Sequence, residues 1–195
     1  MTLSSLPAGA TLDAKTGSFQ WTPSFAQAGE FTLSQALFDS FRFDLSRQIV
    51  GEVRGPEVLA MLKAMESGAG SISTTHAKNA EGAIGKLVTC AMEAGPHITH
   101  DYAVRAIAAS IDIIVHVHLE TTPLPDGTAQ RSRWVTEILT LTPGEREKGY
   151  AVQRVFLAAS GSRQAEPAVL PDEYRELAAW GFALEEFYGQ SEAAS

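Results

Sequence analysis

Cysteine is almost absent from this chain. Cys90 is the only one among 195 residues, so a disulfide within the chain and a metal site built from several cysteines are both excluded. A single thiol is typical of a protein from a reducing compartment. Because Cys90 falls within an apolar helical pattern, we expect it to be a core side chain.

The sequence also lacks basic clusters and long apolar runs. The formal net charge is −8, and no block of lysine and arginine stands out, which argues against nucleic acid as a partner. No run approaches the roughly 20 apolar residues of a membrane span. The first residues do not have the basic segment and apolar segment of a secretory signal. We therefore expect a soluble protein.

Hydrophobic residues make up 45% of the chain, enough for one substantial core. Residues 5–28 are rich in turn formers, with DAKTG between short apolar stretches, which indicates a hairpin or an irregular arm. We predict three regions: a β-rich or irregular arm over 1–28, the main domain over 29–160, and a linker with a C-terminal helix over 161–195.

The main region alternates between helical and strand patterns. Helices are predicted over 31–41, 55–68, 80–95 and 99–110, with Thr99 as the cap of the last, and a final helix over 171–188. Strands are predicted over 47–53, 111–119, 132–141 and 150–158. This order predicts an α/β fold with added antiparallel strands.

Apolar spacing predicts the buried faces of two of these helices. In the helix over 55–68 the expected face consists of Val58, Leu59, Leu62 and Met65. In the helix over 80–95 it consists of Ile84, Leu87, Val88 and Met92.

The strand over 47–53 carries Glu52 near its carboxyl end. Open α/β sheets bind ligands at that edge. A carboxylate placed there can orient a water for attack on a phosphate, or support magnesium through its water shell. A solvated glutamate at a strand end is the alternative that this pattern leaves open.

A second candidate lies in the sequence GSISTTHAKNA, residues 70–80, which we interpret as a loop. Backbone amides and hydroxyl groups in such a loop suit phosphate oxygens, and the imidazole of His76 can stabilise a terminal phosphate. Taken alone, a single loop histidine is more often structural or simply exposed.

Residues 40–95 resemble the Walker B and histidine-box region of the type II/IV secretion ATPases, most of all the CpaF-type motors of tight-adherence pilus assembly. The similarity extends from about Gly29 to about Ala159. It implies half of a RecA-like P-loop NTPase fold with ATP and Mg²⁺ as ligands. It also implies assembly with further copies or intact homologous subunits in a hexamer. Partners would be platform proteins of the inner membrane, with the chain cytoplasmic or peripheral to that membrane.

The resemblance assigns roles residue by residue. The Walker B strand is matched by Ile49, Val50, Gly51 and Glu52, with Glu52 as the catalytic glutamate and an indirect magnesium ligand. The motif RG.E that follows is matched by Arg54, Gly55 and Glu57. The histidine box is matched by Gly68, Gly70, Ser71, Thr74, Thr75 and His76. In that box His76 is expected to approach the γ-phosphate, and the nucleotide-binding set consists of Gly70, Ser71, Thr74, Thr75, Arg54 and Glu57.

The chain also departs from the family pattern. Ala69 and Lys78 stand where many members have histidine and asparagine, and the 195 residues contain no G-x-x-x-x-G-K-[ST] phosphate-binding loop. The nearest imitation, AEGAIGKL, begins with Ala80, ends with Leu87 and lies in a helical pattern, so we predict a helix there. We therefore expect a truncated form that is inactive alone. A noncatalytic subunit-interaction module and a chimeric fragment without selected activity remain alternatives.

Residues 5–31 show a different resemblance. LPAGATLD, TG and WTP resemble part of the Ig-like, cadherin-like repeats of extracellular proteins. The segment is short of a full domain, so we do not expect an Ig sandwich.

Two further histidines alternate in the strand over 111–119. His116 and His118 share one face of a regular strand, where two imidazoles can bind a metal. Without a third ligand nearby in the sequence, a structural or edge-facing role is favoured.

Overall fold

The computed structural model describes residues 9–13, 15, 19–20, 22, 36, 40, 45–68, 70–144 and 148–193. Near the start, β1 (Thr11–Leu12) and β2 (Phe19–Gln20) pair antiparallel, in agreement with the hairpin alternative. The predicted helix over 31–41 and the remainder of the arm lie almost wholly outside the described residues.

A parallel pair of strands carries the two candidate segments. β3 (Arg47–Val50) confirms the predicted strand and pairs in parallel with β4 (Gly70–Ser73), with Ile49 opposite Ile72. The helix α2 (Val58–Met65) connects them, and Gly68 turns the chain with a φ of 82°. The loop interpretation was therefore wrong for residues 70–73. The hydrogen bonds of β4 come from a strand distant in sequence, which local composition does not reveal.

Two more helices follow, and both begin at side-chain caps. At α3 (Ala80–Met92), Asn79 accepts a hydrogen bond from the amide of Gly82 at 2.7 Å. At α4 (His100–Ser110), Thr99 accepts from the amide of Tyr102, which confirms the predicted cap. The segment AEGAIGKL lies inside α3, so it is helical as predicted.

The helices pack around one main core. It joins β3 to α2, α3 and α4 and includes the predicted Cys90 thiol. Met92 was expected in this core but is exposed, because it is the last residue of its helix. The buried face of α2 is also wider than predicted: Leu59 and Met65 are only partly buried, and the fully buried set is Val58, Ala60, Met61, Leu62 and Ala64. Because other elements pack against several sides of α2, more of its side chains are buried than the apolar spacing predicts.

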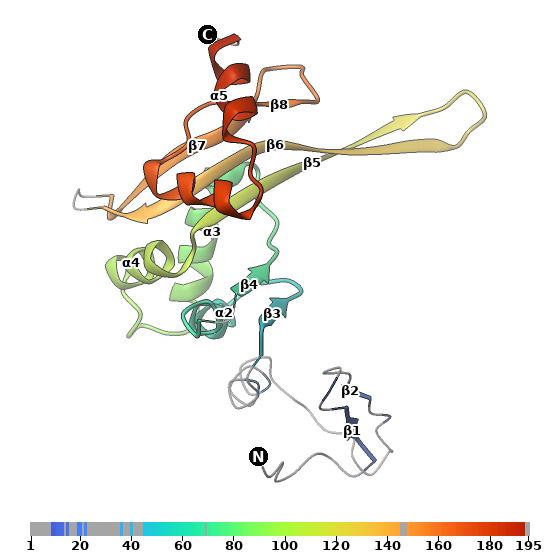
Figure 1. The fold of residues 1–195 in the computed structure, drawn as a ribbon. Coiled ribbons are helices and arrows are strands. Elements are labelled where there is room, and N and C mark those ends of the chain that lie inside the picture. The colour runs from blue at the N-terminus through green and yellow to red at the C-terminus, as the bar shows by residue number, and fades with distance from the viewer. Residues whose placement is uncertain are drawn as a thin grey trace.

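The second half of the chain forms an antiparallel sheet with the order β5-β6-β7-β8. Its strands are β5 (Ile113–Pro123), β6 (Ala129–Pro143), β7 (Tyr150–Ala158) and β8 (Ala165–Pro167). Three of them were predicted. The ends of β5 and β6 project from the body as a long hairpin (Figure 1), which closes at Gly127 with a φ of 80°.

The C-terminal segment differs from the single predicted helix. It forms a 3-10 helix, η2 (Asp172–Trp180), followed by α5 (Leu184–Ala193). Gly181 adopts a φ of 95°, and the amide of Phe182 donates to the carbonyl of Leu177 at 3.1 Å. This glycine-capped ending explains the break between the two helices.

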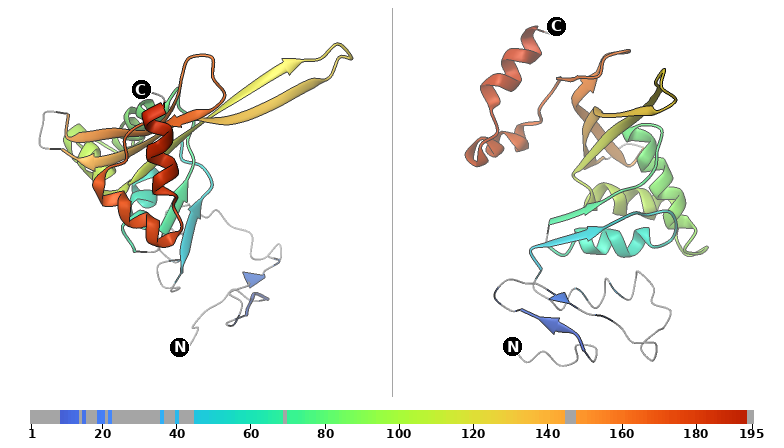
Figure 2. Two further views of the ribbon diagram at one scale, coloured as in Figure 1. Left: turned by 45° about the horizontal axis from the view of Figure 1, so that its top comes forward. Right: turned by 90° about the vertical axis from the view of Figure 1, so that its right-hand side faces the viewer.

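The antiparallel sheet lies between two layers of helices (Figures 1 and 2). α3 and α4 cover one face, where Leu141 of β6 joins the main core. η2 and α5 cover the other face through a smaller core that contains Val155, Leu170 and Phe187. None of the described helices is both long enough and apolar enough to span a bilayer.

Candidate functional site

The carboxyl ends of β3 and β4 bring Glu52 and His76 together. Nε2 of His76 lies 3.0 Å from Oε1 of Glu52, and Nη2 of Arg54 lies 2.6 Å from Oε2. The histidine side chain is 84% exposed, whereas that of Glu52 is only 27% exposed. The carboxylate is thus partly enclosed, while the imidazole faces solvent and is open to a ligand.

Two threonines fix the loop that carries Glu52. Oγ1 of Thr74 donates to the carbonyl of Gly51 at 2.5 Å, and Oγ1 of Thr75 donates to the carbonyl of Val53 at 2.9 Å. The amide of Val53 in turn donates a hydrogen bond to the carbonyl of Thr74 at 2.9 Å. The connection between β3 and β4 therefore continues beyond the strands and sets the distance between Glu52 and His76.

Glu52 is held as an anion. The hydrogen bond from Arg54 lowers its pKa most, and the positive charges of Arg54 and Lys86, with that of His76 when it is protonated, lower it further. Oε1 is buried and makes no hydrogen bond among the described residues, although Nε2 of His76 lies 3.0 Å away. Oε1 therefore keeps a hydrogen-bonding capacity that no described residue uses.

Lys86 belongs to the same site, although sequence reasoning did not select it. Its Nζ donates to the backbone carbonyl of His76 at 2.8 Å from the first turns of α3. Its position on the helix that directly follows the histidine segment is the one feature of the sequence that could have indicated Lys86. The apolar spacing of that helix does not distinguish Lys86 from any other exposed lysine. Together with Arg54 it adds positive charge beside Glu52 and His76.

Glu57 acts on the turn between β3 and α2. Its Oε1 accepts hydrogen bonds from the amides of Arg54 at 2.7 Å and Gly55 at 3.1 Å. These bonds, that from Arg54 foremost, lower the pKa of Glu57. The carboxylate therefore positions Arg54, rather than reaching out toward a ligand.

Gly70 and Ser71 lie at the opposite end of β4 from His76. They pair with Arg47 and Gln48 of β3, and the hydroxyl of Ser71 donates to the carbonyl of Ala64 at 3.2 Å. The structure does not bring these two residues to the Glu52 carboxylate.

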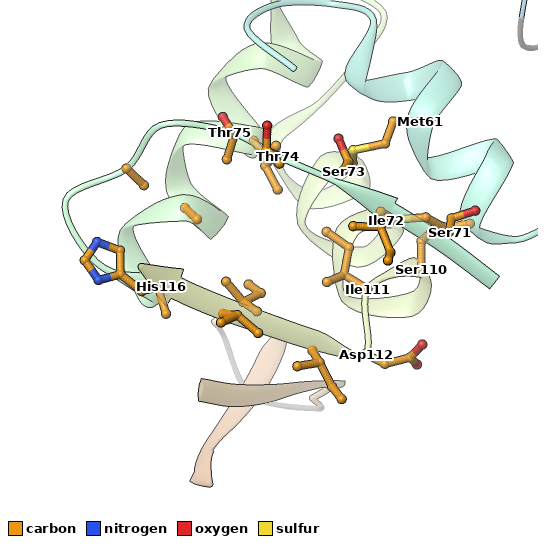
Figure 3. A pocket seen from close by; sticks show the side chains of 18 of the residues that line it. Met61, Ser71, Ile72, Ser73, Thr74, Thr75, Ser110, Ile111, Asp112 and His116 are labelled. Carbon is orange, nitrogen blue, oxygen red and sulfur yellow. The ribbon is translucent and has the colours of Figure 1, made fainter. Parts of the chain in front are cut away.

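A cavity of about 920 Å³ (Figure 3) is lined by His76 but not by Glu52. Its walls are α2, β4 and the segment through His76, the start of α3, and residues 110–117 at the beginning of β5. His76 thus contacts Glu52 while also lining this cavity.

The residues of this site could hold magnesium only together with water molecules and the phosphates of a bound nucleotide. The described residues contain no group of three His, Cys, Asp or Glu side chains placed to hold a metal. Glu52 alone offers a carboxylate oxygen, and Mg²⁺ usually combines one or two carboxylates with waters and substrate phosphates. His116 and His118 do not form a metal pair: Nδ1 of His116 contacts Oγ1 of Thr136 at 2.6 Å, and the ring of His118 contacts that of Trp134 at a tilt of 49°.

Comparison with known proteins gives a family. A family model described as "Type II/IV secretion system protein" matches residues 19–143, more than half of the chain. The crystal structure of the VirB11 ATPase from the Brucella suis type IV secretion system in complex with sulphate is similar, with 26% identity and a TM-score of 0.46. That match covers 55% of this chain and 31% of the other, so the chain spans about a third of that protein. No curated protein matches.

Proposed function

Because the chain belongs to the type II/IV secretion system protein family, we propose that Glu52 and His76 form half of the ATP site of a secretion or pilus-assembly motor. The observation that carries this proposal is the 3.0 Å approach of His76 Nε2 to Glu52 Oε1 at the carboxyl ends of two parallel strands. That edge is where open α/β sheets bind ligands.

In this proposal the Glu52 carboxylate orients the attacking water, and His76 contacts the γ-phosphate from its exposed position. Arg54 and Lys86 add positive charge to balance the phosphates. Magnesium, when bound with ATP, would neutralise phosphate charge, and Glu52 would hold it through a water.

The remaining site residues position this pair. Thr74 and Thr75 fasten the Glu52 loop through their hydroxyl groups, and Glu57 fixes the backbone of Arg54. Gly70 and Ser71 hold β4 against β3. All five thus contribute to nucleotide binding by fixing the geometry of the two groups that face the phosphate.

The wider assignment is part of the same proposal. Residues 29–160 would be the carboxyl half of a RecA-like ATPase domain of the CpaF type, active in a hexamer with intact homologous subunits. Its partners would be pilus or secretion platform proteins at the cytoplasmic face of the inner membrane. The family match and the parallel pair with its terminal carboxylate support this assignment.

The 195 residues alone would not turn over ATP. They contain no G-x-x-x-x-G-K-[ST] loop, whose lysine and amides hold the β- and γ-phosphates in P-loop NTPases. A second candidate function, a noncatalytic module that joins intact subunits, is favoured by the exposed apolar side chains along β4 and β5, among them Ile72 and Val115.

Steady-state ATP hydrolysis distinguishes these roles. The isolated chain with Mg²⁺ should show no more turnover than its Glu52→Gln variant, since both lack the phosphate-binding loop. Turnover by the isolated chain that Glu52→Gln abolishes would show a complete active site and overturn the half-site proposal. A change in the turnover or assembly of an intact homologous motor on mixing would support the interaction module.

A further inference from the structure

A buried carboxylate joins the start of α3 to the antiparallel sheet, against which this helix packs (Figure 1). Glu137 lies in the middle of β6 and is 7% exposed. Its Oε2 accepts a hydrogen bond from the amide of Ala80, the first residue of α3, at 3.1 Å. Ala80 is itself buried, so without this bond its amide would be left unpaired in the interior. Because a buried, unpaired amide is costly, Glu137 fixes the first turn of the helix.

The other described contacts between this turn and the sheet are weaker. The main core does not reach the turn, since its first member on α3 is Ile84. Glu81, the second residue of the helix, forms an ion pair with Lys148, but both side chains are partly or largely exposed. Exposed ion pairs contribute little to stability. Glu137 therefore makes the strongest described link between the first turn of α3 and the sheet.

Arg154 holds the Glu137 carboxylate in its orientation. Nε of Arg154, on the neighbouring strand β7, donates to Oε1 of Glu137 at 2.9 Å, and Oε2 is left for Ala80. Hydrogen bonds between charged groups are stronger than those between neutral groups. Since each carboxylate oxygen has a partner, the side chain of Glu137 cannot turn away from α3 without breaking a bond.

The segment that carries His76 is consequently fixed at both of its ends. The hydroxyl of Thr75 is bonded to the loop that follows β3, and the amide of Ala80 is bonded to Glu137 on β6. Thr75 and Ala80 are five residues apart in the sequence, a stretch that spans at most about 18 Å. The backbone of His76 therefore depends on the parallel pair at one end and on the antiparallel sheet at the other.

His76 also follows α3 directly, because Lys86 of that helix donates to the carbonyl of His76 at 2.8 Å. The side chain of His76 is 84% exposed, so packing does not fix the imidazole. Its place beside Glu52 is set by the backbone that carries it. A shift of the start of α3 would therefore move the imidazole away from the carboxylate.

We propose that Glu137 is a positioning residue for His76: by holding the start of α3 to β6, it sets where the imidazole lies relative to the Glu52 carboxylate. Glu137 touches neither of these two side chains and acts only through Ala80 and the helix. The consequence for nucleotide binding rests on the proposed function, whereas the placement of the imidazole does not.

NMR of the full 195-residue chain tests this placement. Glu52→Gln should shift the ring signals of His76, because the two side chains lie 3.0 Å apart. When Glu137 is replaced by alanine, the same Glu52 substitution should produce a shift at least about twofold smaller, since the imidazole no longer stays beside residue 52. A shift of equal size in both backgrounds would overturn the proposal.

Two further substitutions at residue 137 separate the bonds that Glu137 makes. Glu137→Gln keeps an oxygen that can accept from the amide of Ala80, so the shift caused by Glu52→Gln should be largely restored. Glu137→Thr suits a strand but is too short to reach Ala80, so it should behave as Glu137→Ala and replaces it if the alanine variant does not fold. If glutamine gives no restoration, the effect belongs to the pair with Arg154, and the role of the Ala80 contact is refuted.

Two control variants exclude a general loosening of the sheet. Val155→Ala removes packing from the smaller core, on the face of the sheet away from α3. Glu81→Gln removes the exposed ion pairs of the same helix turn. Neither variant should reduce the shift that Glu52→Gln causes at His76, although Val155→Ala lowers the melting temperature. A reduction in either control as large as in Glu137→Ala would contradict the proposal.

Titration with a nonhydrolysable MgATP analogue separates this inference from the proposed function. If both hold, the analogue shifts the His76 signal, and Glu137→Ala weakens its binding by about fivefold. If Glu137→Ala reduces the Glu52-dependent shift but the analogue does not move the His76 signal even in the unmodified chain, the half-site fails and the positioning role stands. If the analogue binds both chains equally and the Glu52-dependent shift is unchanged, the positioning role fails and the half-site stands.

Discussion

Nε2 of His76 lies 3.0 Å from Oε1 of Glu52, although the two residues follow different strands. The backbone bond between Val53 and Thr74 and the hydroxyl groups of Thr74 and Thr75 maintain this relationship. The pair is therefore built into the sheet edge rather than formed by a chance meeting of two flexible side chains. Predictions about the site follow from the groups that hold it.

Lys86→Met should change the position of His76 without unfolding the chain. The ammonium of Lys86 donates a hydrogen bond to the carbonyl of His76, and its charge lowers the pKa of Glu52. Methionine keeps an unbranched side chain of similar length but removes this charge and this donor. NMR should show shifted amide signals for residues 75–78 and little change in the melting temperature. Lys63→Met, on α2, provides the control. Unchanged amide signals near His76 in the Lys86 variant would contradict the assigned contact.

Glu57 should make the free energy of unfolding depend on pH in the acid range. Backbone amides hold its pKa below the usual range in the folded state, so the folded chain binds fewer protons than the unfolded chain. The resulting stabilisation is complete above the unfolded pKa of about 4.3 and is lost as pH falls through the folded value. Urea unfolding between pH 3 and 7 should therefore show a smaller loss on acidification for Glu57→Gln than for the unmodified chain. Parallel curves for both chains would refute this role.

Glu137 should contribute far more to stability than a surface carboxylate. It is 7% exposed and accepts hydrogen bonds from the amide of Ala80 at 3.1 Å and from Nε of Arg154 at 2.9 Å. Losing charge-assisted bonds of this kind costs about 2 kcal/mol, so Glu137→Ala should lower the unfolding free energy by that amount. Glu120→Ala, which breaks an exposed ion pair with Arg163, should cost at most about 1 kcal/mol. Chemical denaturation of both variants compares them, and equal losses would contradict the prediction.

Gly149→Ala should destabilise the chain more than Gly161→Ala. Both glycines have positive φ, 75° and 82°, which costs an alanine about 1–2 kcal/mol. At Gly149 an added Cβ would also lie 2.8 Å from Cγ1 of Val104 in α4, whereas nothing lies within 4 Å at Gly161. Thermal unfolding of the two variants measures the difference. The same melting temperature for both variants would show that α4 moves away from the added methyl group without loss of stability, which would contradict the prediction.

Much of the local structure could be predicted from the sequence. The helix over residues 80–92, the Thr99 cap and the strand before Glu52 all follow from patterns contained within a few residues. The strand Gly70–Ser73 was missed because its stability comes from β3, and Lys86 was missed because only the folded α3 brings it to His76. The break at Gly181 shows the limit of apolar spacing, which continues through a glycine that the backbone uses as a helix end.

The most direct test of the half-site is an NMR titration of the isolated chain with a nonhydrolysable MgATP analogue. The ring signals of His76 are followed, with His118 as the internal control because its ring packs against Trp134. His76→Ala assigns the signal. The account predicts a saturable shift of the His76 signal alone, which Glu52→Gln alters. An unmoved His76 signal, or equal shifts of both histidines, would contradict a phosphate half-site at Glu52 and His76.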